Sequence, residues 1–115
     1  MTIKPLFLLL ISAALAGAAH PPALAAAAAP AAAPVVHISN FRFGPQVLTV
    51  PAGTTVTWVN DDDEPHNVTA SDHSYRSPIL DSGGRFSRTY ATPGEYAYFC
   101  ALHPHMTGHI VVTGR

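Results

Sequence analysis

The chain has 115 residues, in which six basic residues stand against seven acidic ones and the formal net charge is −1. This length allows one domain of ordinary size. The near-neutral charge excludes the strongly basic profile of a nucleic-acid-binding protein, so no nucleic-acid partner is expected.

The N-terminal segment predicts export rather than part of a fold. Lys4 precedes an apolar run over residues 6–19, and small residues follow that run. This order is typical of a secretory signal peptide, and the run is shorter than the ~20 apolar residues of a membrane span. We expect residues 1–25 to be a signal peptide for export to the periplasm, with cleavage after Ala25 or, as a second choice, after Ala18. An uncleaved membrane anchor is the alternative, and no stable span is expected once the peptide is removed.

Residues 26–34 contain only alanine and proline, which predicts a flexible or semi-extended linker. The folded domain is then expected at residues 35–115, which is a small domain for a stable hydrophobic core. Small exported domains are often crosslinked by disulfides, but Cys100 is the only cysteine in the chain. An unpaired cysteine in an exported protein is reactive, paired with another chain or bound to a ligand. A metal ion would protect the thiol and add folding free energy.

Short alternating runs separated by turn residues predict an all-β domain. Turn signals recur about every 8–12 residues, as in an antiparallel sandwich or barrel. Phe41 and Phe43 are expected on one face of a run, and the irregular segment 71–84 is expected to cover a sheet edge or carry function. An antibody-type sandwich is excluded because it needs two cysteines. The expected strands cover residues 35–40, 47–50, 54–60, 66–71, 85–90, 94–100 and 108–114.

Cys100, His103 and Met106 form a C-x2-H-x2-M pattern where the run 94–100 ends. A thiolate, an imidazole and a thioether together favour copper that cycles between Cu(I) and Cu(II). One more nitrogen is needed, and His66 is the candidate. If its strand lies beside the one that ends at Cys100, the imidazole can reach the same pocket.

These segments resemble the cupredoxins, in particular the amicyanin- and plastocyanin-like group, over about residues 35–112. The resemblance rests on "VPAGTTVTWVN", "PHNV" and "CALHPHMTGHIVV". It implies an eight-stranded Greek-key antiparallel β-sandwich with one type 1 (blue) copper ion. The function that it implies is one-electron transfer between larger redox proteins. The implied metal ligands are His66, Cys100 and His103 as strong equatorial ligands and Met106 as the weak axial ligand.

The resemblance also implies roles for neighbours of the ligands. Asn67 is the position that ties its segment to the cysteine loop, and His103 is the exposed ligand through which electrons pass. Relatives with this loop length often have a proline before the second histidine and an aromatic residue before the methionine. This chain has Leu102 and His105 at these positions. The difference puts in doubt the reduction potential and the partner that the resemblance implies, but it does not affect the metal. The implied apolar docking patch around His103 is made by Leu102, Pro104 and either Phe43 or Pro65.

Three classes of function remain open from the residues. The first is a monomeric electron carrier with transient cytochrome- or dehydrogenase-type partners. The second is a copper carrier or store, which needs exposed, exchangeable ligands. The third is a zinc or structural module, although a thioether adds almost nothing for zinc. An enzyme is not expected, because no open coordination position and no acid–base pair accompany the pattern. The acidic residues 61–64 are interpreted as a solvated turn, with steering of a basic partner as the alternative.

Overall fold

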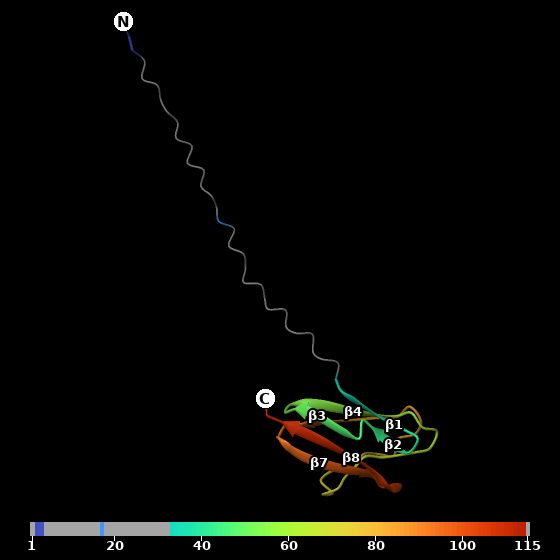
Figure 1. Ribbon diagram of the computed structural model, residues 1–115. Coiled ribbons are helices and arrows are strands. Elements are labelled where there is room, and N and C mark those ends of the chain that lie inside the picture. Colours follow the sequence, from blue (N-terminus) through green and yellow to red (C-terminus); the bar gives the residue numbers. More distant parts are fainter. Residues whose placement is uncertain (1, 4–16, 18–32, 115) are drawn as a thin grey trace.

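A computed structural model of the chain describes residues 2–3, 17 and 33–114. Residues 35–113 contain eight strands that pack as two sheets (Figure 1). Most of the predicted signal peptide and most of the predicted linker lie outside the described residues. Within the part of the chain that is described, no helix is long and apolar enough to cross a membrane.

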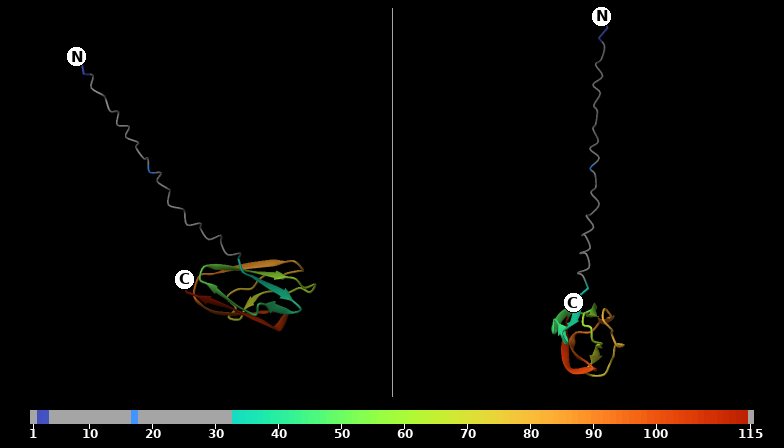
Figure 2. Two further views of the ribbon diagram at one scale, coloured as in Figure 1. Left: turned by 45° about the horizontal axis from the view of Figure 1, so that its top comes forward. Right: turned by 90° about the vertical axis from the view of Figure 1, so that its right-hand side faces the viewer.

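The two sheets have four strands each. They lie face to face as two layers, as the turned views of Figure 2 show. The strand order is β2-β1-β4-β6 in the first sheet and β3-β8-β7-β5 in the second. The predicted all-β Greek-key sandwich is therefore confirmed. The strands are β1 (Val35–Ser39), β2 (Arg42–Gly44), β3 (Val47–Pro51), β4 (Thr54–Asn60), β5 (Thr69–Ala70), β6 (Arg85–Tyr90), β7 (Gly94–Cys100) and β8 (His103–Thr113).

The sheets are mixed rather than purely antiparallel, which corrects one part of the prediction. β1 runs parallel to β4, and β3 runs parallel to β8, whereas the other named pairs are antiparallel. Turn residues report which neighbouring runs form hairpins, but they carry no information on pairing between strands distant in sequence. The parallel pairs arise because the chain leaves the first sheet after β2, forms β3 in the second sheet and returns as β4.

The core lies between the sheets and is built around aromatic rings. The Trp58 and Tyr98 rings are almost fully buried and meet edge to face, with centroids 5.4 Å apart. Phe43 also packs against Tyr98 edge to face, with ring centroids 4.7 Å apart. Burial of these rings removes a large apolar area from water and stabilises a domain of this size. The aliphatic members of the core are Val36, Ile38, Val50, Val56, Val68, Leu80, Ile110 and Val112.

Phe41 and Phe43 do not share a face, contrary to the prediction. Asn40 and Phe41 have φ values of 51° and 57°, which places both in the left-handed region. Alternation of side chains holds only for extended backbone, so the turn directs Phe41 outward while Phe43 enters the core. The ring of Phe41 is 48% exposed, and that of Phe43 is 3% exposed.

Two strands differ by more than one residue from the prediction. The run expected at residues 66–71 is a strand only at β5, and His66 instead forms an isolated bridge with Leu80. The final strand begins at His103 rather than near residue 108. The segment 71–84 folds back along this edge through bridges from His66 to Leu80 and from Thr69 to Arg76. Its predicted role in covering a sheet edge is therefore confirmed.

The free energy of unfolding is expected to fall less steeply with rising alkaline pH in the Tyr98→Phe variant than in the unsubstituted protein. Burial raises the pKa of Tyr98 from 10.0 to about 12. The folded state then keeps a proton that the unfolded state has released, so the free energy of unfolding falls as pH rises through this range. For Tyr98 the fall is about 2–3 kcal/mol, at about 1.4 kcal/mol for each unit of pKa. Burial also raises the pKa of Tyr75 and of Tyr90, which acts in the same direction.

Denaturant unfolding at several alkaline pH values, in the presence of a metal chelator, measures this effect. Tyr96→Phe is the matched control, because it also removes one tyrosine hydroxyl. Tyr96 is only half-buried, and its hydroxyl donates to the carbonyl of Thr92. A Tyr98→Phe variant that loses stability as steeply as the unsubstituted protein would contradict the prediction.

Candidate metal centre

Three of the predicted ligands converge on one point. The Sγ atom of Cys100 lies 3.8 Å from Nδ1 of His66 and 3.8 Å from Nδ1 of His103. One ligand atom from each of the three residues lies within 4.8 Å of the other two. Both His66 and Cys100 are fully buried, whereas His103 is partly exposed. The structure therefore brings together two nitrogens and one sulfur around a space of metal-ion size.

The ends of two adjacent strands hold Cys100 and His103. Cys100 is the last residue of β7, His103 is the first residue of β8, and the two are paired across the connection. The β7–β8 register shifts between Phe99 and Cys100, as at a β-bulge. Such a shift re-aims a side chain at the end of a ladder.

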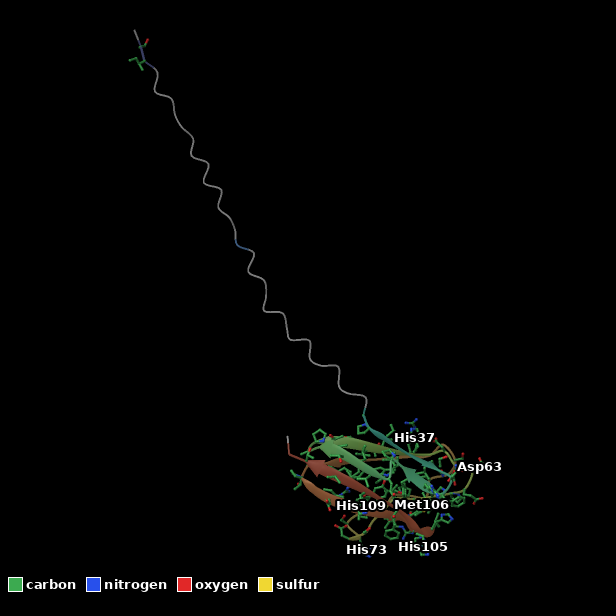
Figure 3. All side chains as sticks on the ribbon, viewed as in Figure 1. His37, Asp63, His73, His105, Met106 and His109 are labelled. Atoms are coloured by element: carbon green, nitrogen blue, oxygen red, sulfur yellow. The ribbon has the colours of Figure 1, made fainter. Side chains whose placement is uncertain are left out.

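Met106 and His105 are neighbours on β8 that differ in burial. Met106 is 5% exposed and belongs to the same buried cluster as Cys100. Figure 3 shows Met106 inside the outline of the sandwich and His105 at its edge. His105, Met106 and Phe41 line an open groove of about 490 Å³ at this end of the molecule. Met106 is therefore available to the centre from β8, whereas His105 faces the solvent.

His66 reaches the centre from a different part of the chain. Its backbone amide donates to the carbonyl of Leu80 at 3.1 Å, and its carbonyl accepts the amide of Leu80 at 2.7 Å. The following β5 pairs with β7 at Phe99 and Tyr98. These two attachments place the buried imidazole of His66 beside Cys100, as the sequence predicted.

Asn67 connects the segment that carries His66 to the connection between β7 and β8. Its side-chain oxygen accepts the amide of Ala101 at 2.7 Å, and its own amide donates to the Cys100 sulfur at 3.4 Å. Asn67 is fully buried. The predicted tie between this segment and the cysteine loop is confirmed, and the hydrogen bond from the Asn67 amide also holds the Cys100 sulfur in place.

Asp62 supports the opposite side of His66. Its Oδ2 atom lies 2.9 Å from Nε2 of His66. Partial burial acts to raise the pKa of the Asp62 carboxyl. The amides of Phe41 and Asn40 and the contact with His66 outweigh that effect and hold the pKa below its usual range. The sequence interpretation of residues 61–64 as a solvated turn is therefore wrong for Asp62.

Phe41 is a residue of the centre that the sequence interpretation missed. Its ring meets His66 edge to face at 5.2 Å and His103 edge to face at 5.0 Å. Phe43 is buried and so cannot belong to the predicted docking patch, whereas Phe41 is exposed and contacts His103. The exposed apolar residues that contact or directly adjoin His66 and His103 are Phe41, Pro65, Leu102 and Pro104, and they define the candidate docking patch.

The donor set fits copper better than zinc or a hard cation. The converging atoms are imidazole nitrogens and a thiol sulfur, with a buried thioether in the same cluster. Soft sulfur ligands select copper over magnesium, calcium or manganese. No group of three or more potential ligands from His, Cys, Asp and Glu other than His66, Cys100 and His103 comes together in the described ranges. The other described histidines are all exposed: His37, His73, His105 and His109.

A two-sheet β-sandwich with a buried cysteine between two histidines at one end defines a class of small metalloproteins. Comparison with known proteins places the chain in one family of that class. The sequence profile of the cupredoxin-like domain matches residues 6–112. The chain belongs to this family, and the predicted resemblance is confirmed.

Individual relatives give the degree of likeness. The chain is 34% identical over 83 residues to amicyanin from Paracoccus denitrificans, a match covering 68% of this chain and 63% of that protein. It is 36% identical over 82 residues to amicyanin-alpha from Methylorubrum extorquens, covering 67% of this chain and 69% of the relative. It also resembles the solved purple cupredoxin from Nitrosopumilus maritimus, with a TM-score of 0.67 and 34% identity. That match covers 70% of this chain and 99% of the other.

Asn67→Ala is expected to loosen the connection between β7 and β8. The change leaves the amide of Ala101 without its acceptor in a partly buried position. Loss of such a partner lowers the free energy of unfolding by about 1–3 kcal/mol. Chemical denaturation of the copper-free protein measures the loss. Thr69→Val is the control, because the Thr69 hydroxyl reaches the same Asn67 oxygen at 3.4 Å, a longer and weaker bond. An equal effect of both substitutions would contradict this role of Asn67.

Proposed function

We propose that the chain is an exported, periplasmic one-electron carrier with a single type 1 copper ion. Its ligands are His66, Cys100, His103 and Met106. The observation that carries the proposal is the position of the Cys100 sulfur, 3.8 Å from Nδ1 of each of the two histidines. Two imidazoles, one thiolate and a weak axial thioether form the donor set of blue-copper electron-transfer sites. Copper bound by this set cycles between Cu(I) and Cu(II) and so carries one electron.

The way in which the chain holds these side chains supports electron transfer. Cys100, His103 and Met106 belong to hydrogen-bonded strands, and the bond from Ala101 to Asn67 fixes the connection between those strands. His66 is fixed on both sides, by the backbone bridge to Leu80 and by Asp62. Donors held in this way move little when the charge at the centre changes by one unit.

His103 is the proposed point of entry and exit for electrons. It is the only one of the three converging residues that is not buried. Phe41 and Leu102, which are 48% and 44% exposed, lie on the docking patch beside it. Exposed apolar residues that gather around one site mark a contact surface. A monomer with this surface would meet cytochrome- or dehydrogenase-type redox partners transiently.

Copper transport or storage is the alternative, and the burial of the ligands argues against it. His66 and Cys100 are fully buried and Met106 is 5% exposed, so a transfer partner could reach only His103 directly. An enzymatic role is not proposed, because a closed set of four protein donors leaves no position for a substrate.

The full chain titrated with Cu(II) is expected to develop an intense blue absorption band that saturates at one copper per chain. The band arises from charge transfer between the Cys100 thiolate and copper, and it should bleach with a mild reductant. Cys100→Ser should abolish the band, whereas Ser77→Ala, a change to another buried side chain, should retain it. A colourless product, or a faint band that survives Cys100→Ser, would refute the proposal.

Leu102→Asp is expected to slow electron exchange with a c-type cytochrome at least several-fold without changing the blue band. A charge in the docking patch must be desolvated when the partner covers it. Stopped-flow mixing of the reduced variant with the oxidised cytochrome measures the rate. Thr89→Asp is the matched control, because it adds the same charge at an exposed position away from the docking patch. Thr89 pairs with Thr55 near the start of β4, and the segment with His66 follows the other end of that strand. Equal rates for both variants would place the contact surface elsewhere.

A further inference from the structure

The carboxylate of Asp62 contacts two separate parts of the chain. Its Oδ1 atom accepts the amide of Asn40 at 2.7 Å, and Oδ2 accepts the amide of Phe41 at 2.9 Å. The same Oδ2 atom lies 2.9 Å from Nε2 of the buried His66. The side chain of Asp62 is only 13% exposed, so these contacts are largely shielded from water.

We propose that Asp62 is a positioning residue of the copper centre that sets both the tautomer of His66 and the place of Phe41. This inference rests on the proposed function and deepens it, because it names a residue that controls the reduction potential of the same site.

The tautomer follows from the hydrogen bond. A neutral imidazole carries one N–H, and an ionised carboxylate can only accept. The contact with Asp62 therefore places the hydrogen of His66 on Nε2. This leaves the lone pair of Nδ1 directed to the side on which Cys100 lies, at 3.8 Å. Histidine ligands commonly donate their other N–H to a carboxylate or carbonyl, which fixes the ring and raises its basicity.

The charge of Asp62 gives the direction of its effect on potential. A negative charge hydrogen-bonded to a ligand increases the electron donation of that ligand. It also interacts more favourably with the doubly charged ion than with the singly charged one. Both effects stabilise Cu(II) relative to Cu(I), so Asp62 lowers the reduction potential.

The place of Phe41 depends on the same carboxylate. A bulky residue with φ of 57° is unusual, and Asn40 before it has φ of 51°. Two consecutive amides in such a turn form a concave site for an anion, and the anion here is the Asp62 carboxylate. The turn holds the Phe41 ring against His66 and His103, at 5.2 and 5.0 Å. Without the anion, the turn loses the contact that offsets its strain and Phe41 is released.

Asp62→Asn in the copper-loaded full chain tests the proposal. Its Cu(II) affinity should fall by about 10–100-fold, as for other partners of metal-bound histidine. The reduction potential should rise by about 59 mV for every tenfold by which Cu(II) binding weakens more than Cu(I) binding. Asp63→Asn is the matched control. It removes the same charge from the same turn, but Asp63 is exposed and lies at the outer edge of the molecule in Figure 3. The inference is overturned if Asp62→Asn shifts the potential no more than Asp63→Asn does.

A second measurement needs no copper and no folded variant. Nitrogen NMR of the copper-free, unsubstituted protein at mildly alkaline pH should show the hydrogen of His66 on Nε2. A hydrogen on Nδ1 would overturn the tautomer assignment even if Asp62→Asn fails to fold. Failure of the proposed function is recognised separately, because the unsubstituted chain would then give no blue band. With a blue band present, equal potentials in the two asparagine variants refute this inference alone.

Discussion

The structure depends on one constraint: a single thiol must meet two imidazoles at a point shielded from water. Cys100 and His66 are 34 residues apart in the chain, yet their donor atoms are 3.8 Å apart in the fold. Two strands alone would not hold this pair, because β5 has only two residues. The bridge from His66 to Leu80 and the hydrogen bond from Ala101 to Asn67 provide the remaining restraint.

Neighbouring carboxylates of the acidic turn lie in different surroundings. Four consecutive acidic residues, 61–64, follow β4. Asp61 is exposed and pairs with the exposed His37 at 2.6 Å, a contact that adds little stability in water. Asp62 instead binds the β1–β2 turn and the buried imidazole of His66. The difference comes from the fold, because Asp61 is directed toward an exposed histidine and Asp62 toward a buried one.

The sequence predicted much of the fold and of the centre, for identifiable reasons. Alternation of apolar residues marked β4, β6 and β7 with correct bounds, since hydrophobic burial acts on each strand locally. The C-x2-H-x2-M pattern located three candidate ligands because the connection after Cys100 is too short to separate them. His66 was predicted on chemical need, and its placement beside Cys100 is what the structure adds.

The remaining features depend on contacts between distant segments, which local patterns do not encode. The parallel pairs β1–β4 and β3–β8 are of this kind, and so is the extension of β8 to His103. Phe41 was assigned to the wrong face because its turn is left-handed. No glycine marks that turn, and its conformation is supported by a carboxylate 21 residues later.

The asymmetry between the two histidines connects the geometry to the proposed function. His66 is buried and bonded to a carboxylate, whereas His103 is partly exposed on an apolar surface. A site with both imidazoles buried would be rigid but would have no edge for a partner to approach. A site with both exposed would admit water and allow the donors to move between oxidation states. One fixed and one accessible imidazole combine a low cost of reorganisation with a short path to the surface. An electron carrier needs both properties, whereas a copper store needs ligands that can be released.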